Sequence, residues 1–151
     1  MSFVGTILRT VTQFQVRNKS IEELIASAEA GGKTIVTRTV DKPDTPPNRQ
    51  VLRHIIGIER WGQRRLKTLV GEPPIQDEYD GYQPAETLDF NALRATFEQT
   101  RAETIAVVRE IQQRGITTKT TARHNDMGDL PVANWLRYLT MHANFETRQF
   151  K

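Results

Sequence analysis

The sequence of 151 residues predicts an all-α fold, a single four-helix bundle formed by residues 1–151. Apolar residues recur at the spacing of one helix face over four long segments, and capping residues, glycines and prolines mark the ends of these segments. No pair of segments shows the alternation of two paired strands. We therefore expect one core between four helices, with any β-structure confined to residues 33–41.

The first predicted helix starts at about Phe3 and is interrupted before Ser20. Ser20 and Glu23 have the spacing of a capping box, in which each side chain satisfies a backbone N–H of the other residue. A short helical segment follows, and Gly31 and Gly32 are expected to end it. The first part has an apolar face formed by Phe3, Ile7, Leu8, Val11 and Phe14.

Residues 33–49 are predicted to be irregular. Their first half is rich in β-branched residues, and their second half contains prolines that are expected to exclude a helix. The second long helix is predicted over residues 48–70, and Gly71 closes it.

Long connections flank the third predicted helix. Residues 71–86 contain prolines, glycines and tyrosines, and residues 116–130 are polar. Asp89 is a suitable N-cap for the third helix, which ends at Gly115, and Pro131 fits the first turn of the fourth. Connections longer than a bundle needs often cover a site at one end of the helices.

The composition excludes several classes of protein. Hydrophobic residues make up 37% of the chain and charged residues 26%, which is typical of a folded globular protein. The chain has no cysteine, so disulfide scaffolds, thiolate zinc sites and cysteine nucleophiles are excluded. The net charge of +3 is small and its basic residues are scattered, whereas a nucleic-acid-binding protein usually carries a basic stripe.

The chain also lacks the features of export and membrane insertion. Its N-terminal segment has no basic leader before an apolar run and no small-residue cleavage site. No segment approaches the roughly 18 apolar residues that a membrane span needs. We therefore expect a cytoplasmic protein that binds neither nucleic acid nor a membrane.

Two polar residues fall within the apolar stripe of the predicted fourth helix, residues 131–150. At about 100° per residue, Glu146 lies about 40° from His142, on the side that Trp135 and Leu139 share. Residues four apart can converge on one point. A buried carboxylate is costly unless it is paired, protonated or bound to metal. An imidazole one turn away would complete half of a divalent-metal site.

The second predicted helix offers a matching residue. His54 lies at the edge of its apolar face, beside Ile58 and Trp61, and Glu59 falls on the same apolar side. Two histidines and one carboxylate from facing helices would leave coordination positions open, as catalytic metal ions require.

Other interpretations of these residues stay open. A single histidine on a helix flank, such as His54, is often only a hydrogen-bonded core residue. His142 and Glu146 could form a simple hydrogen bond, or Glu146 could pair with Arg65. Three aromatic residues are expected to form core or pocket walls: Trp61, Trp135 and Tyr138.

Two further titratable residues are expected to be structural. Glu59 is interpreted as the partner of an arginine in the bundle rather than as a metal ligand. His124 lies in the polar segment with Asp126 and Asp129, and a solvated loop is expected there rather than a cluster of ligands.

Two segments carry a family resemblance. Residues 52–61 (LRHIIGIERW) resemble the second-helix signature of the DinB-like superfamily, the DNA-damage-inducible and YfiT-like four-helix bundles. Residues 135–149 (WLRYLTMHANFETRQ) are similar to its closing helix, where a histidine and a second ligand stand four residues apart. The resemblance implies a divalent metal ion, commonly zinc or nickel, with His54, His142 and Glu146 at the ligand positions, and a homodimer.

The resemblance also implies an activity. Its characterised members include thiol S-transferases and mycothiol-dependent isomerases. The commonest pattern has histidine where this chain has Glu146, and the mycothiol type includes a carboxylate. We therefore expect a metal-dependent enzyme acting on a small-molecule substrate such as a thiol, as a low-molecular-weight-thiol S-transferase or a related transferase, isomerase or hydrolase. The alternative is a non-catalytic bundle that serves as a binding or dimerisation module.

Overall fold

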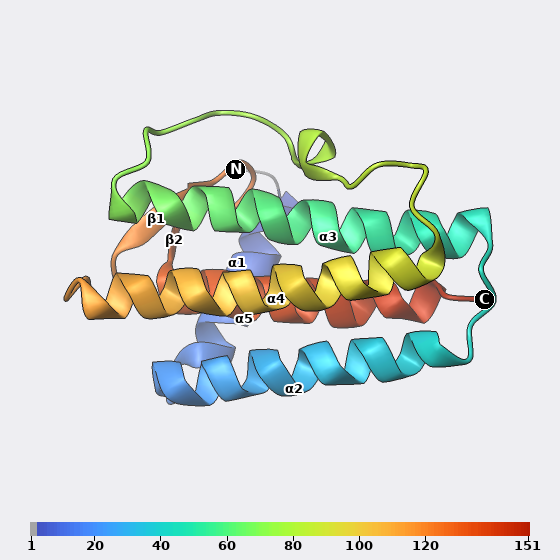
Figure 1. Cartoon of the computed structure of the whole chain (residues 1–151). Helices are drawn as coiled ribbons and strands as arrows, with labels where there is room; N and C mark the ends of the chain where they lie inside the picture. Colours follow the sequence, from blue (N-terminus) through green and yellow to red (C-terminus); the bar gives the residue numbers. More distant parts are fainter. Residues whose placement is uncertain (1–2) are drawn as a thin grey trace.

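The computed structural model describes residues 3–151 and confirms the predicted all-α class (Figure 1). The described chain forms five α-helices, namely α1 (Phe3–Val16), α2 (Ile21–Val40), α3 (Pro46–Lys67), α4 (Phe90–Gln113) and α5 (Val132–Glu146). It also forms three short 3-10 turns, at Thr68–Val70, Tyr79–Tyr82 and Thr147–Gln149. None of the described helices is long and apolar enough to cross a membrane.

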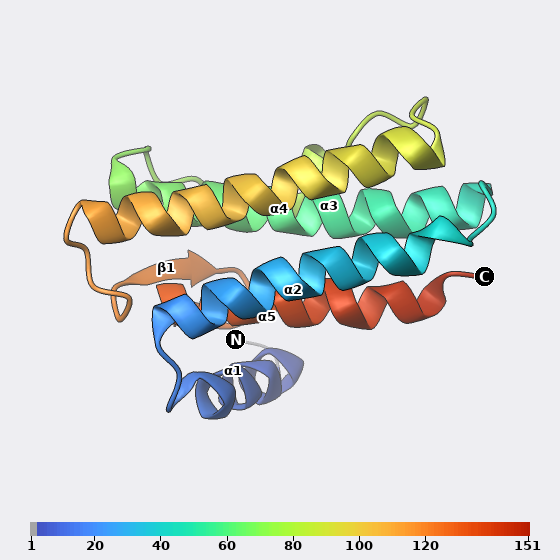
Figure 2. The ribbon, with the colours of Figure 1, turned by 60° about the horizontal axis from the view of Figure 1, so that its bottom comes forward.

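Four of the helices, α2, α3, α4 and α5, lie side by side (Figures 1 and 2). Helix α3 packs against α4 and α5, and α2 packs against the same two helices. Helix α1 lies outside this group, against α5, and is inclined to the other helices (Figure 1).

The direction of the helices explains the long connection between α3 and α4. The colours of Figure 1 show that α3 and α4 run in the same direction, opposite to α2 and α5. The chain must therefore return along the length of α3 before α4 can begin. Residues 71–89, called the connector below, form this return and pass over α3 (Figure 1).

The predicted interruption before Ser20 is confirmed and separates α1 from α2. Ser20 Oγ accepts the Glu23 backbone N–H at 3.1 Å, and the Glu23 carboxylate accepts the Ser20 N–H at 2.6 Å. Because the two helices have different directions, the described chain contains five helices rather than the four expected.

The predicted end of this helix at the glycine pair is wrong, and residues 33–41 are helical up to Val40. A Cβ atom on Gly32 would lie only 3.1 Å from Cγ of Arg101 on α4, and one on Gly31 would lie 3.3 Å from side-chain atoms of α5. The glycines therefore permit close helix packing instead of ending the helix. Tertiary packing outweighs the β-propensity of the segment that follows.

Helix α3 begins at Pro46, slightly earlier than predicted. Thr45 is its N-cap, and the Thr45 side chain accepts the Asn48 backbone N–H at 3.4 Å. Prolines fit this first turn because its N–H groups have no partner within the helix. Asp89 caps α4 as predicted, with its carboxylate accepting a first-turn N–H at 2.8 Å.

The expectation that any β-structure is confined to residues 33–41 is wrong, because the strands of the described chain lie in and next to the polar segment 116–130. A hairpin forms from two antiparallel strands, β1 (Thr121–His124) and β2 (Gly128–Pro131). Ala122 pairs with Leu130, and both side chains are buried. Gly128 has a φ of 71°, in the left-handed region that favours glycine, where the turn enters β2.

The core consists of two clusters of buried apolar residues. One cluster joins the hairpin to α5 and to the ends of α3 and α4, and Trp135 is its largest fully buried side chain. The other contains Phe90, Phe97 and Ile35 and lies toward the opposite ends of the helices. Each cluster draws on several helices, so the bundle has its own apolar core independent of any bound ligand.

Candidate metal centre

Three side chains that the sequence singles out converge where α3 packs on α5. His54 comes from α3, and His142 and Glu146 come from successive turns of α5. One potential ligand atom from each lies within 4.8 Å of the other two. The two imidazole centroids are 5.1 Å apart, and His142 Nε2 lies 3.8 Å from Glu146 Oε1. The last distance is too long for a hydrogen bond.

The nitrogens of this cluster lack hydrogen-bond partners. His142 Nδ1 is buried without a partner among the described residues, and no hydrogen bond to the His54 imidazole occurs there. Burial, together with the neighbouring His54, lowers the pKa of His142 to about 4. His142 is therefore neutral at pH 7, which is the form that coordinates a metal ion.

The carboxylate of Glu146 has one oxygen near His142 and one bonded to Gln149. Gln149 Nε2 donates a hydrogen bond to Glu146 Oε2. The side chains of His142 and Glu146 are 16% and 15% exposed, so the cluster is sheltered but still open to solvent. Two imidazoles and a carboxylate, with unsatisfied nitrogens, fit a divalent ion that keeps open coordination positions.

Two tyrosine rings flank the cluster. Tyr79, from the connector, meets His54 edge to face with ring centroids 5.2 Å apart, and Tyr138 lies 5.9 Å from His142. Burial, foremost, raises the pKa of Tyr138 above its usual value, so its hydroxyl stays protonated at neutral pH. Tyr138 was predicted as a wall residue, whereas Tyr79 was missed, although the tyrosine-containing connector was expected to cover a site.

Comparison with known proteins identifies the family of the chain. The sequence model of the DinB superfamily matches residues 12–149, which is most of the chain. The chain belongs to the DinB superfamily. The resemblance read from the two histidine-containing segments is thereby confirmed. No curated protein and no solved structure matches the chain.

In this DinB-superfamily chain, a glycine brings the connector close to the cluster. Gly57 lies three residues after His54 on α3. A Cβ atom there would lie 2.8 Å from Gln83 Cγ and 3.3 Å from the Tyr79 carbonyl oxygen. The missing side chain therefore lets the 3-10 turn Tyr79–Tyr82 pack directly on α3, which places Tyr79 beside His54.

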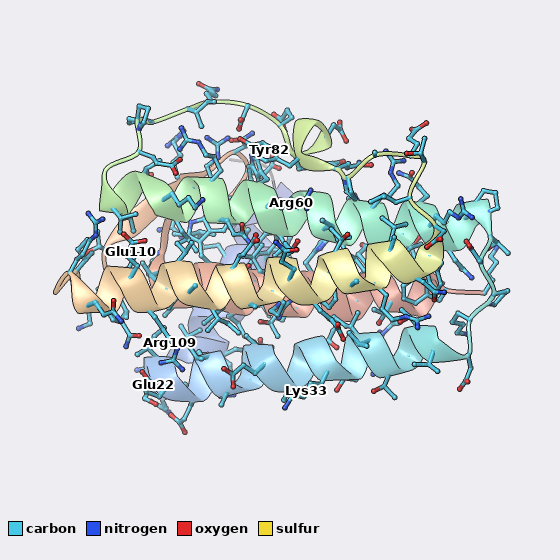
Figure 3. The ribbon with its side chains drawn as sticks, in the orientation of Figure 1. Glu22, Lys33, Arg60, Tyr82, Arg109 and Glu110 are labelled. Atoms are coloured by element: carbon cyan, nitrogen blue, oxygen red, sulfur yellow. The ribbon has the colours of Figure 1, made fainter. Side chains whose placement is uncertain are left out.

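Asp77 fastens the connector to the rest of the molecule. Arg65 Nη2 donates to Asp77 Oδ1 at 2.9 Å, and the Tyr82 hydroxyl donates to Oδ2 at 2.5 Å. Trp61 Nε1 and Asn125 Nδ2 donate to the Asp77 carbonyl oxygen at 3.3 and 3.0 Å. Figure 3 shows Tyr82 on the connector above α3. The alternative pairing of Arg65 with Glu146 is wrong, because Arg65 is engaged here.

Glu59 pairs with a bundle arginine, as predicted. Arg101 Nη2 donates to Glu59 Oε2 at 2.9 Å, and the Thr104 hydroxyl donates to Oε1 at 2.8 Å. Glu59 is 1% exposed and Arg101 is 4% exposed. Both carboxylate oxygens are occupied within the core, so Glu59 has no role in the His54 cluster.

His124 is buried, which corrects the expectation of a solvated loop. It is 5% exposed, and its Nδ1 accepts the backbone N–H groups of Asp126 and Met127 at 3.1 and 3.3 Å. Burial is the main cause that lowers its pKa to about 4. Asp129 instead faces Arg123 at 3.7 Å on the surface. The ring of His124 packs against Trp61, Trp135 and Tyr138.

Proposed function

We propose that this chain is a metal-dependent enzyme built on the four-helix bundle of the DinB superfamily, with one divalent ion held by His54, His142 and Glu146. The observation that carries the proposal is the convergence of three ligand atoms from two helices within 4.8 Å of one another. The match to the superfamily over residues 12–149 supports it independently.

We propose zinc or nickel as the ion. Imidazole nitrogen is a good ligand for both metals, and a single carboxylate is common beside it in catalytic zinc sites. Magnesium and calcium prefer sites made of oxygen ligands, so the two histidines argue against them. Glu146 contributes one negative charge, and the neutral form of His142 contributes none.

The proposed reaction depends on the coordination positions of the ion that the three protein ligands leave free. A divalent ion, when bound, acts as a Lewis acid that lowers the pKa of a coordinated thiol or water. His54 and His142 would act as neutral donors, and Gln149 orients the Glu146 carboxylate through its hydrogen bond. The rings of Tyr79 and Tyr138 shelter the site from solvent, which strengthens electrostatic interactions inside it.

We propose a small molecule as the substrate, and a low-molecular-weight thiol as the preferred class. The half-buried ligands admit a small group rather than a folded protein surface. The reaction would be S-transfer or a related transfer, isomerisation or hydrolysis. We also propose a homodimer, supported by exposed apolar residues on the outer helix α1, namely Ile7, Val11 and Phe14. Light scattering measures the dimer directly.

A calorimetric titration with zinc tests the proposal. Wild type should bind about one equivalent, and His142→Ala should lose this binding because two ligands remain. The matched control is His124→Asn, which removes a buried histidine outside the cluster and should bind as wild type. Equal zinc binding by wild type and His142→Ala would assign the ion to another place. Zinc binding by neither protein would favour the non-catalytic binding or dimerisation module.

A further inference from the structure

Two phenol hydroxyls beside the cluster have no hydrogen-bond partner among the described residues. Tyr79 approaches from the connector, with its ring 5.2 Å from that of His54. Tyr138 approaches from α5, one turn before His142, with a ring separation of 5.9 Å. A phenol hydroxyl can donate one hydrogen bond and can also accept one. These two hydroxyls are therefore free to pair with a bound molecule.

The two phenol rings lie against neighbouring histidines. Tyr79 contacts His54 and Tyr138 contacts His142, and the imidazole centroids of these two histidines are 5.1 Å apart. The two phenols thus flank one cluster, from two different elements.

Both rings are held in place by other parts of the structure. Tyr138 packs edge to face against His124 at 5.1 Å and against Trp135 at 5.9 Å. Tyr79 is positioned by the close approach at Gly57 and by the hydrogen bonds that anchor Asp77. Donors fixed before a ligand arrives lose little entropy on binding it.

The arginines that support the connector are already engaged. Arg65 donates to Asp77, and Arg53 donates to the Pro84 carbonyl oxygen at 3.0 Å and to Glu86 at 3.2 Å. The two phenols that flank the cluster are neutral donors. Two neutral imidazoles, one carboxylate and a divalent ion give the centre a net charge of about +1, which favours a monoanion.

We propose that Tyr79 and Tyr138 bind the molecule that occupies the open side of this centre, and that this molecule is a small monoanion with a carboxylate group. A carboxylate offers about four lone-pair sites and can accept from two donors, whereas sulfur is a weak acceptor. The hydroxyls therefore select the carboxylate of the substrate rather than its thiol. This inference rests on the proposed function, because it places the carboxylate at the metal centre.

The test uses the cobalt-loaded full chain with acetate as the probe. Visible absorption of Co²⁺ reports both uptake of the ion and the binding of acetate next to it. Tyr79→Phe and Tyr138→Phe should each bind Co²⁺ as wild type does and raise the acetate dissociation constant about tenfold, the loss of one hydrogen bond to a charged group. The matched control is Thr34→Val, which removes an exposed hydroxyl that donates to the Ala30 carbonyl oxygen within α2, and its acetate affinity should stay within about twofold of wild type.

The outcomes separate the two proposals. If wild type takes up no Co²⁺, the proposed function fails and this inference fails with it. If wild type takes up Co²⁺ but both phenylalanine variants bind acetate as tightly as wild type does, only the inference is overturned. A variant that loses Co²⁺ affinity as well reveals a role in holding the ion, which also contradicts the inference.

Gly57→Ala provides an independent check on the position of Tyr79. The added Cβ would displace the connector while keeping the phenol. Acetate should bind more weakly to Gly57→Ala than to wild type, and the same change in the Tyr79→Phe background should have no further effect. An equal loss in both backgrounds would show that Gly57 acts on the metal centre without Tyr79 and would contradict the proposed positioning.

Discussion

Glu59 on α3 and Arg101 on α4 form an ion pair inside the core, with Arg101 Nε 2.6 Å from Glu59 Oε1. Arg101 Nη1 also donates to the Ala28 carbonyl oxygen on α2 at 3.1 Å and to the Thr140 hydroxyl on α5 at 3.4 Å. One arginine therefore links four helices. The carboxylate of the pair is unavailable to the His54 cluster, which leaves Glu146 as the acidic residue of that cluster.

Breaking this pair should destabilise the protein strongly. Glu59→Gln leaves the Arg101 charge buried without its counter-ion, and we expect a loss of about 3–5 kcal/mol in the free energy of unfolding. The double variant Glu59→Met with Arg101→Leu should recover most of this loss, because no buried charge remains. Urea denaturation followed by circular dichroism measures both.

The matched control is the exposed pair of Glu110 and Arg114 on the end of α4. These side chains are 45% and 53% exposed, with 2.6 Å between Arg114 Nη2 and Glu110 Oε1. Glu110→Gln should change the stability by no more than about 0.5 kcal/mol, because solvent screens the pair. Equal effects of Glu59→Gln and Glu110→Gln would contradict the structural importance of the buried pair.

A glycine in α3 should control how closely α3 and α5 approach. A Cβ atom on Gly62 would lie 2.8 and 2.9 Å from the Leu139 methyl groups. Although alanine favours a helix by about 1 kcal/mol over glycine, the overpacking should outweigh it and lower the stability by about 1–2 kcal/mol. Zinc affinity should fall too, because the two helices carry the ligands.

A control glycine lies in the connector. Nothing lies within 4 Å of a Cβ atom on Gly81, so Gly81→Ala should leave melting temperature and zinc affinity near those of wild type. If Gly62→Ala instead raised the stability, helix propensity would dominate, and the α3–α5 contact would be looser than described.

His124 should make the stability depend on pH. Its pKa of about 4 in the folded protein lies below the ordinary value of 6.5, so the unfolded chain takes up the proton first as the pH falls. The contribution of neutral His124 to the free energy of unfolding is complete above about pH 6.5 and decreases between pH 6.5 and 4. It amounts to about 3 kcal/mol, at about 1.4 kcal/mol per pKa unit.

The measurement is the stability of metal-free wild type and His124→Asn across this range. Asparagine can still accept the backbone N–H groups of the turn but does not titrate. His142, with a similarly lowered pKa, adds its own pH dependence to both proteins. The wild type should therefore lose more stability than the variant on acidification. Parallel curves would show that His124 is not held neutral by burial.

Removing the metal should weaken the protein without unfolding it. The two apolar clusters do not depend on the ligands, in contrast to small zinc domains that need the ion to fold. Zinc at about a hundred times its dissociation constant adds about 2.7 kcal/mol. Chelator should therefore lower the melting temperature by several degrees in wild type and leave His142→Ala unchanged.

A histidine in place of Glu146 should keep the metal ion bound. Glu146→His gives three imidazole ligands, the commoner set in the resemblance noted above, and its melting temperature should still fall with chelator. Circular dichroism should show helical spectra for wild type and both variants. A chelator effect absent from wild type, with no response to added zinc or nickel in any of the three, would favour the non-catalytic module.

Most of the helical segments and the three clustered side chains could be predicted from periodicity. The apolar stripe of α5 contains His142 and Glu146 whatever the partner helix, and helix capping at Ser20 and Asp89 depends only on neighbouring residues. These features are local, so a single sequence contains the information.

The features that the sequence did not predict depend on distant contacts. Gly31 and Gly32 resemble a helix end unless the side chains of α5 and α4 are known to pack against them. The alternation of exposed and buried residues in β1 covers only four residues, too few to distinguish it from a loop. Tyr79 reaches His54 only because the connector folds back over α3.

The metal content of the chain, purified without added metal, tests the central claim most directly. Elemental analysis of wild type should find about one zinc or nickel ion per chain, the number that a single cluster of three ligands holds. The same analysis of His142→Ala should find well under half of that amount. A wild-type protein free of divalent metal, or an equal content in both proteins, would contradict a metal centre at His54, His142 and Glu146.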